Sequence, residues 1–135
     1  MSFPGNYNQV VIEKFRANGG KVEGPNQLLL LTTIGAKSHQ PHTTPVAYST
    51  DGDRLVIVAS KGGAPTNPAW YHNLLANPVV TVELGTERFQ ARATVVTGPE
   101  RDRLYAQHAA LMPGFAEYTK KTTRQIPVIL LERMS

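Results

Sequence analysis

Two short segments of the sequence carry the residue types that bind phosphate groups. They are Gly35-Ala36-Lys37-Ser38 and Ser60-Lys61-Gly62-Gly63, each with a lysine, a serine and at least one glycine. Glycine allows backbone N–H groups to approach a ligand closely, and lysine adds a positive charge. Either segment alone is more typical of a solvated turn with a surface lysine. Both follow expected strands, and the second precedes an expected helix N-terminus, which favours an anion site.

The two segments match no standard nucleotide-binding loop. The pattern GxxxxGK[ST] is absent, and no GxGxxG leads from a strand into a helix. A serine hydrolase is poorly supported, because GxSxG is absent and Ser38 and Ser60 have no identifiable base and orienting acid. The sequence contains no cysteine, which excludes disulfides, thiolate nucleophiles and cysteine-ligated metals.

The histidines give little support to a metal site. His39 and His42 are three residues apart in an expected loop, whereas His72 and His108 are isolated. None has an obvious carboxylate companion, so we expect no bound metal.

The charge balance favours anionic partners. The chain has 14 Lys and Arg against 10 Asp and Glu, a formal charge of +4, which alone does not distinguish phosphate ligands from nucleic acid or lipid headgroups. Lys120, Lys121 and Arg124 form a late basic cluster that we interpret as a solvated face. A nucleic-acid platform needs a longer basic stripe with interleaved aromatics, so we expect no nucleic acid, and peripheral membrane contact stays open.

A short helix is expected directly after the second phosphate-type segment. Asn67 is placed to cap it, Pro68 suits its first position, and Asn77-Pro78 ends it. Trp70 and Leu74 are four residues apart, a spacing typical of core positions.

Asn73 lies between apolar neighbours on this helix and needs a hydrogen-bond partner if it is buried. A backbone carbonyl and the edge of a cofactor ring are both suitable partners, and the sequence does not choose between them.

The remaining pattern is that of a small antiparallel β structure. Asp51-Gly52 and Gly85-Thr86 are typical hairpin turns. Alternating apolar residues from Phe89 to Val95 indicate a strand with one buried face. Strands are expected over residues 28–34, 44–48, 55–59, 79–84, 89–96 and 127–131.

Helices are expected to interrupt the strands. One covers Asn6–Phe15, with Val10, Val11 and Phe15 on one face and Gly19-Gly20 as its end. Another begins near Pro99 and runs to Leu111, and residues 115–121 form a further turn or two. Hairpins with inserted helices favour a closed or partly open β-barrel over a parallel sheet. The expected fold class is therefore mainly β with short helices (α+β).

The length suits one domain, with residues 1–20 as an N-terminal helix and lead-in to it. Of 135 residues, 41% are hydrophobic and 18% are charged, an ordinary globular balance. The longest aliphatic run, Leu28–Leu31, is far short of a membrane span, and the start lacks a secretory signal pattern. We therefore expect a cytoplasmic protein.

Taken together, these segments resemble the deazaflavin-dependent nitroreductase family. The resemblance extends from about Leu28 to Leu131 and is carried by the string SKGGAxxxPxWYxNLxANP, which begins at Ser60. It also includes Gly35–Ser38, Thr44-Pro45 and the late segment from Pro113 to Tyr118. It implies a split β-barrel that binds coenzyme F420, the phosphorylated deazaflavin hydride carrier.

The resemblance also implies roles for individual residues. Ala36–Ser38 and the loop of Lys61 would hold the phosphate and acidic tail, and His42–Ala47 and Ala69–Asn73 would line the deazaflavin. The implied cofactor-binding residues are Ala36, Lys37, Ser38, His42, Thr43, Thr44, Pro45, Val46, Ala47, Val58, Ala59, Ser60, Lys61, Ala69, Trp70, Tyr71, His72, Asn73 and Phe115.

The late segment departs from the family pattern. Where relatives carry several tyrosines facing the substrate, this chain has Met112 and Phe115, and Tyr118 remains. We interpret these three residues as the substrate wall. The expected reaction is hydride transfer from F420H2 to a small electron acceptor, a quinone-like, activated alkene or nitroaromatic compound, with quinones favoured.

Two alternatives stay open from the residues. One is an oxidoreductase of the same architecture that uses FMN, since phosphate loops alone do not distinguish the two cofactors. The other is an F420-binding or storage protein without turnover. Because split barrels commonly pair, we expect a homodimer.

Overall fold

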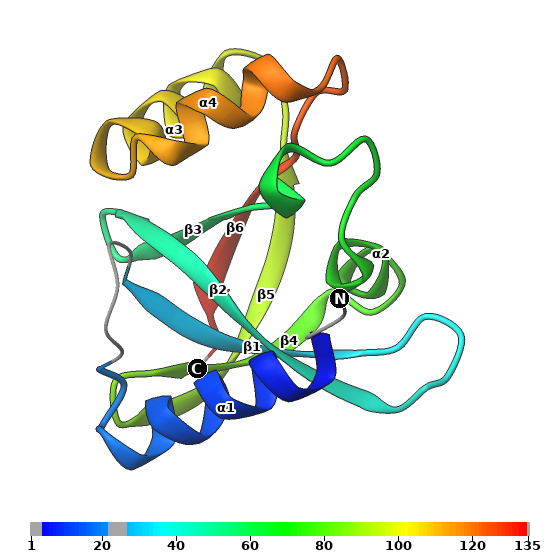
Figure 1. The fold of residues 1–135 in the computed structure, drawn as a ribbon, viewed down its shortest axis with the longest axis vertical. Coiled ribbons are helices and arrows are strands. Elements are labelled where there is room, and N and C mark those ends of the chain that lie inside the picture. Colours follow the sequence, from blue (N-terminus) through cyan, green and yellow to red (C-terminus); the bar gives the residue numbers. More distant parts are fainter. Residues whose placement is uncertain (1–3, 22–26, 135) are drawn as a thin grey trace.

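The computed structural model describes residues 4–21 and 27–134, and its centre is a closed barrel of antiparallel strands (Figure 1). Around the barrel the order is β1-β2-β3-β6-β5-β4. The strands are β1 (Leu28–Ile34), β2 (Pro41–Asp51), β3 (Arg54–Val58), β4 (Val79–Leu84), β5 (Glu87–Val96) and β6 (Val128–Arg133). This architecture confirms the expected mainly β barrel with short helices.

Both predicted hairpins are confirmed. Strands β2 and β3 pair from Tyr48↔Ile57 to Asp51↔Arg54, and β4 and β5 meet at Leu84↔Glu87. Strand β6 closes the barrel by pairing with β3 on one side and β5 on the other. Strand β2 begins at Pro41, three residues earlier than expected, because residues 41–43 continue the ladder with β1.

Several strands are buried on both faces, which explains their continuous apolar runs. Leu29 and Leu31 of β1 point into the barrel core, whereas Leu30 packs outside against Ile12 and Phe15. Strands β3 and β6 repeat the pattern, with their outward residues in a second core cluster. That cluster contains Val56, Val58, Val96, Leu104, Tyr105, Met112, Phe115, Ile126, Val128 and Leu130.

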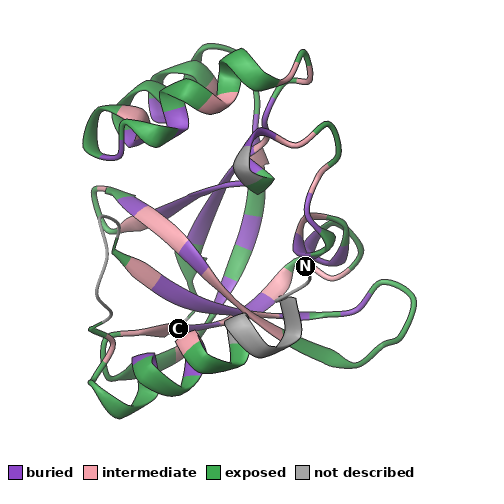
Figure 2. Cartoon of the chain, viewed as in Figure 1, coloured by how far each residue is buried: buried purple, intermediate pink, exposed green. Residues whose placement is uncertain are grey.

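Helices cover two separate outer regions of the barrel (Figures 1 and 2). Helix α1 (Pro4–Ala17) lies across β1, and α3 (Gly98–Leu111) and α4 (Gly114–Lys121) form a pair over the second core cluster. In the part of the chain that the structure describes, no helix is both long and apolar enough to cross a membrane. Arg16 of α1 donates two hydrogen bonds to the Glu83 carboxylate of β4, at 3.0 and 2.8 Å, which lowers the pKa of Glu83.

The buried face of α1 differs from the predicted one. Ile12 and Phe15 are buried, but Val10 is 46% exposed. Ile12 and Phe15 are three residues apart and share one side of the helix, whereas Val10 is turned away from it.

The start of α2 (Ala69–Ala76) also corrects a prediction. Pro68 is the N-cap residue and no side chain caps the helix. Asn67 does not act as the cap because its Oδ1 accepts a hydrogen bond from Arg124 at 2.7 Å.

Candidate functional site

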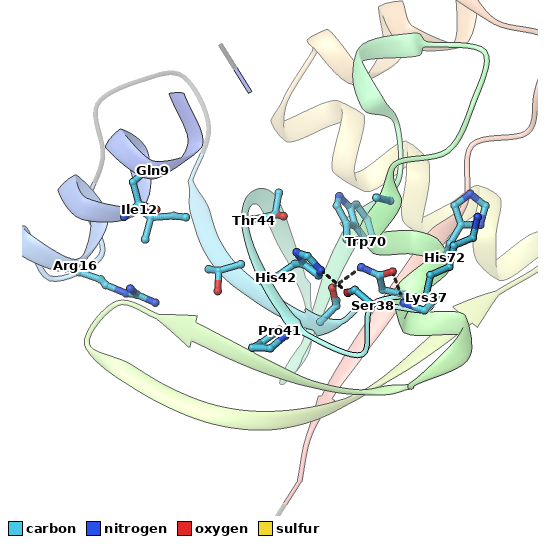
Figure 3. A pocket seen from close by; sticks show the side chains of 16 residues that line it. Gln9, Ile12, Arg16, Lys37, Ser38, Pro41, His42, Thr44, Trp70 and His72 are labelled. Atoms are coloured by element: carbon cyan, nitrogen blue, oxygen red, sulfur yellow. Dashed lines mark hydrogen bonds between the residues drawn. The ribbon is translucent and has the colours of Figure 1, made fainter. Parts of the chain in front are cut away.

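A pocket of about 1100 Å³ lies between α1, the loop that joins β1 to β2, and the start of α2 (Figure 3). Gln9, Ile12 and Arg16 form one side of it, and Trp70 and His72 lie on the other. Its lining residues are Gln9, Ile12, Arg16, Thr33, Gly35, Ala36, Lys37, Ser38, Pro41, His42, Thr43, Thr44, Ala69, Trp70, His72 and Asn73.

The lining combines positive charge with apolar surface. Arg16 and Lys37 are the permanent cations among the residues that border it, and no Asp or Glu is among them. Ile12 and the large ring of Trp70 supply apolar surface. Such a pocket suits an anionic ligand with a flat apolar part.

Asn73 fixes the loop that forms one wall of the pocket. Its Oδ1 accepts a hydrogen bond from the Ala36 N–H at 3.0 Å, and its Nδ2 donates to Thr33 Oγ1 at 3.1 Å. Asn73 is only 9% exposed, so both halves of its amide find partners inside the protein. The question that the sequence left open is thus answered by a backbone N–H and a threonine hydroxyl.

The conformation of this loop depends on Gly35. A Cβ at Gly35 would lie 2.2 Å from Ser38 Oγ and 3.0 Å from His42 Nε2, and these two atoms are themselves 3.0 Å apart. The N–H groups of Gly35, Ala36, His39 and Gln40 all have partners within the protein. The absence of a side chain at Gly35 therefore leaves room for the Ser38 and His42 side chains. The sequence suggested that the Gly35 N–H would bind a ligand, but this N–H already donates to the Gln40 carbonyl.

The second phosphate-type loop lies elsewhere. It follows β3, contains the short 3-10 helix η1 (Lys61–Gly63) and packs against α4, where a Cβ at Gly63 would lie 2.9 Å from Lys121 Cβ. Lys61 adopts a positive φ of 49°, and its Nζ donates to Thr66 Oγ1 at 3.3 Å. In the single chain this loop does not border the pocket.

Arg124 corrects the prediction of a solvated basic face. Its guanidinium donates to the carbonyl oxygens of Ala64 (3.0 Å), Ala59 (3.1 Å) and Ser60 (2.7 Å) and to Asn67 Oδ1 (2.7 Å). Arg124 is therefore part-buried and bound to the backbone of the second loop. A planar guanidinium group can donate to several carbonyl oxygens at once.

The structure brings about half of the implied cofactor residues together around the pocket. These are Ala36, Lys37, Ser38, His42, Thr43, Thr44, Ala69, Trp70, His72 and Asn73. Others lie outside its lining: Pro45, Val46, Ala47, Val58, Ala59, Ser60, Lys61, Tyr71 and Phe115. Val46 and Ala59 are part of the barrel core, and Tyr71 packs against it.

Five lining residues were not identified from the sequence: Gln9, Ile12, Arg16, Thr33 and Pro41. Thr33 and Pro41 flank the first loop, whose Gly35 belongs to the predicted anion-binding segment, and could have been included for that reason. For the residues of α1 the sequence carries no signal beyond an amphipathic helix.

The residues interpreted as the substrate wall lie on the side of α3 and α4. Met112 and Phe115 are 5% and 6% exposed in the second core cluster, and Tyr118 packs against it with partial exposure. The Tyr105 hydroxyl donates to the Phe115 carbonyl oxygen, and the rings of Phe115 and Tyr118 meet edge to face. In the single chain these side chains fill space between helices and barrel, so their contact with substrate stays a prediction.

His108 is a buried group that the sequence did not single out for any role. It is 0% exposed, its Nδ1 lies 2.7 Å from Ser49 Oγ, and its ring meets Phe115 edge to face. Burial lowers its pKa to about 4, so it is neutral near pH 7. Among the described residues, the histidines and carboxylates form no group of three that could hold a metal.

Comparison with known families and structures identifies the family of the chain. The model of the F420H(2)-dependent quinone reductase family matches residues 7–133. The chain belongs to this family. The F420-dependent part of the resemblance is thereby confirmed, while the family description names quinone reduction instead of nitro reduction.

Individual members of the family share sequence and fold with this chain. An F420H(2)-dependent quinone reductase of Mycobacterium tuberculosis is 42% identical over 120 residues, which cover 85% of this chain and 79% of the relative. A solved F420H2-dependent reductase superposes with a TM-score of 0.72 at 38% identity, covering 78% of this chain and 93% of its own. A solved structure described as a domain-swapped dimer superposes with a TM-score of 0.74 at 32% identity. The match covers 96% of this chain and 99% of the other.

Proposed function

We propose that the protein transfers hydride from reduced coenzyme F420 to a quinone-like acceptor. The observation that carries this proposal is the pocket between α1, the first loop and α2. In a member of the F420H(2)-dependent quinone reductase family, it is lined by Lys37, by Arg16 in its ion pair with Glu83, and by Trp70. This donor set fits a phosphorylated, acidic cofactor with a flat ring.

We assign the anionic part of the cofactor to residues of both loops. Lys37 and Ser38 border the pocket and offer a cation and a hydroxyl. Arg16 also borders it, but its guanidinium is paired with the Glu83 carboxylate at 2.8 Å, so we assign the cationic contact to Lys37. Ser60 and Lys61 are assigned to the same anionic part, although they do not border the pocket of the single chain.

We assign the ring to the side of the pocket formed by Ala69 and Trp70. Ala69 and Trp70 would pack on it, and His42, Thr43 and Thr44 would surround its edge with groups that donate and accept hydrogen bonds. When bound, the reduced cofactor supplies the hydride, so the chain itself needs no strong base. Its side chains bind, orient and exclude water.

For the acceptor, we propose quinones over nitroaromatic compounds, with activated alkenes as a further class. Met112 and Phe115, which are buried in the single chain, carry no hydroxyl that could orient a nitro group or donate a proton to it. Tyr118 is the remaining phenol in that segment. A partial gain of nitroimidazole reduction in Phe115→Tyr would support this assignment.

We also propose a homodimer, supported by the domain-swapped dimer among the solved structures at 32% identity. A cytoplasmic location and peripheral contact with a membrane stay predictions from the sequence.

The cofactor assignment is tested by titrating the protein separately with F420 and with FMN and following cofactor fluorescence. We expect saturable binding of F420 and much weaker binding of FMN. Tight binding of FMN with none of F420 would overturn the proposal and favour a flavin-dependent oxidoreductase on the same barrel. Binding of F420 without oxidation of F420H2 by any quinone would instead indicate a storage protein.

A further inference from the structure

The second loop holds an unusual pair of backbone conformations. Ser60 is right-handed, with φ −76° and ψ −38°, and Lys61 is left-handed, with φ 49°. A right-handed residue followed by a left-handed one turns successive backbone N–H groups toward one point, an arrangement that binds anions. Residues with a side chain disfavour the left-handed region, so something must hold Lys61 in it.

Arg124 contacts the loop on both sides of this pair. Its Nη1 and Nη2 donate to the carbonyls of Ala59 and Ser60, which directly precede Lys61, and its Nε donates to the carbonyl of Ala64. The guanidinium thus occupies the carbonyl side of the turn. A fourth bond, to Asn67 Oδ1, joins the loop to the residue that precedes the N-cap of α2.

The other contacts of the loop restrain it less directly. The N–H of Gly63 donates to Ser60 O and that of Ala64 to Lys61 O, which closes the turn upon itself. The Lys61 side chain donates a hydrogen bond to Thr66, also within the loop. The hydrogen bonds of Arg124 come from the segment between α4 and β6, about 60 residues further along the chain, and tie the loop to the barrel.

We propose that Arg124 is a positioning residue that holds Ser60 and Lys61 in their anion-binding conformation. The proposal rests on the proposed cofactor role of this loop and extends it to a residue that does not itself contact the ligand. Arg124 offers a planar set of donors to several carbonyls, which a lysine at the same place does not reproduce.

The first test measures the Kd of the full-length protein for F420 in Arg124→Met and Arg124→Lys. We expect Kd to rise by about tenfold in both variants, since the loop loses its anchor while the pocket is unchanged. The matched control is Arg101→Met: Arg101 donates to the Ile126 carbonyl at 3.2 and 2.7 Å but touches no residue of the loop. It should lower the melting temperature and leave Kd unaltered.

The second test asks whether Arg124 acts through the conformation of Lys61. Lys61→Ala and Lys61→Gly both remove the cation, but only glycine adopts the left-handed conformation freely. Adding Arg124→Met should therefore raise Kd about tenfold more in Lys61→Ala than in Lys61→Gly. A merely structural role would lower the melting temperature of both pairs and raise their Kd values equally.

The outcomes separate the two proposals. If Lys61→Ala itself leaves the Kd for F420 unchanged, the cofactor role of the loop is wrong. If Lys61→Ala weakens F420 binding but Arg124→Met does not, the positioning role is wrong and the cofactor role stands. The same conclusion follows if Arg124→Met raises the Kd equally with alanine and with glycine at position 61.

Discussion

The two lysine-containing loops look alike in the sequence and are built in different ways. The Gly35–Gln40 loop is closed by its own hydrogen bonds and anchored by the Asn73 side chain from α2, and it forms a wall of the pocket. The Ser60–Asn67 loop is held from outside by Arg124, rests on α4 and presents a left-handed lysine. The same residue types are therefore held by a buried amide in one loop and by a guanidinium in the other.

The two loops should therefore respond to different substitutions and conditions. The first depends on a buried amide whose loss leaves polar groups without partners. The second depends on α4 and the segment after it, and Phe115 of α4 packs edge to face on the buried His108 ring. Four perturbations, taken from the largest expected effect to the smallest, test this separation.

Asn73→Ala should destabilise the fold by about 2 to 4 kcal/mol, because the Ala36 N–H and the Thr33 hydroxyl both lose a buried partner. Urea denaturation measures this loss. Asn77→Ala is the control on the same helix, since its amide makes only an exposed bond of 3.5 Å to the Ile34 carbonyl. Equal stabilities of the two variants would contradict the anchoring role of Asn73.

Acid should destabilise the side of the molecule that supports the second loop. The pKa of His108 is about 4 in the folded protein, against the ordinary 6.5, so the unfolded chain binds more protons between these values. The free energy of unfolding should fall by about 3 kcal/mol as the pH decreases from 6.5 to 4, with no contribution from this group above pH 7.

The contribution of His108 is isolated by substitution. His108→Gln removes the titration and should flatten the pH dependence, whereas His72→Gln, at an exposed position, should leave it intact. An unaltered pH profile in His108→Gln would show that other groups cause the acid sensitivity.

Lys61→Ala should weaken F420 binding by roughly 1 to 3 kcal/mol if its contact is a charge-assisted hydrogen bond. Isothermal titration of the folded variant measures the change. Lys21→Ala, which removes an exposed cation distant in sequence from both loops, is the control for loss of net charge.

Lys37→Ala should have the smallest effect on binding, about 0.5 to 1 kcal/mol, because its side chain lies at an exposed position where solvent and salt screen its charge. Raising the ionic strength should weaken binding to the unmodified protein more than binding to the variant. Equal salt dependence of the two would argue against contact between Lys37 and the cofactor.

The barrel could be predicted because its signals are local. Apolar runs such as Leu28–Ile34 and turns such as Asp51-Gly52 fix strands and hairpins within a few residues. The contacts of Arg124 could not be predicted from the sequence. Its acceptors are carbonyl oxygens about 60 residues away, and any residue type supplies a carbonyl. For the same reason the sequence predicts Asn67 as a helix cap, whereas its side chain accepts a hydrogen bond from the distant Arg124.

The sequence predicted only those pocket residues that lie close to a recognisable loop. Residues adjacent to recognisable loops, such as Ser38 and His42, could be named from the sequence, whereas Arg16 reaches the pocket only because α1 lies across β1. Met112 and Phe115 were assigned from a resemblance, and their burial depends on how α3 and α4 pack on the barrel.

The most direct test of the proposed cofactor pocket is the oxidation of F420H2 by menadione, which is monitored as the return of F420 absorbance. The rate is compared between the unmodified protein and a variant in which a large side chain fills the pocket. Ala69→Trp places a large ring at the pocket, and Leu75→Trp places the same ring on the same helix at a 53% exposed position outside the lining. We predict rapid oxidation by the unmodified protein and by Leu75→Trp, and loss of most activity in Ala69→Trp. No oxidation by the unmodified protein, or full activity in Ala69→Trp, would contradict the assignment of this pocket to the cofactor.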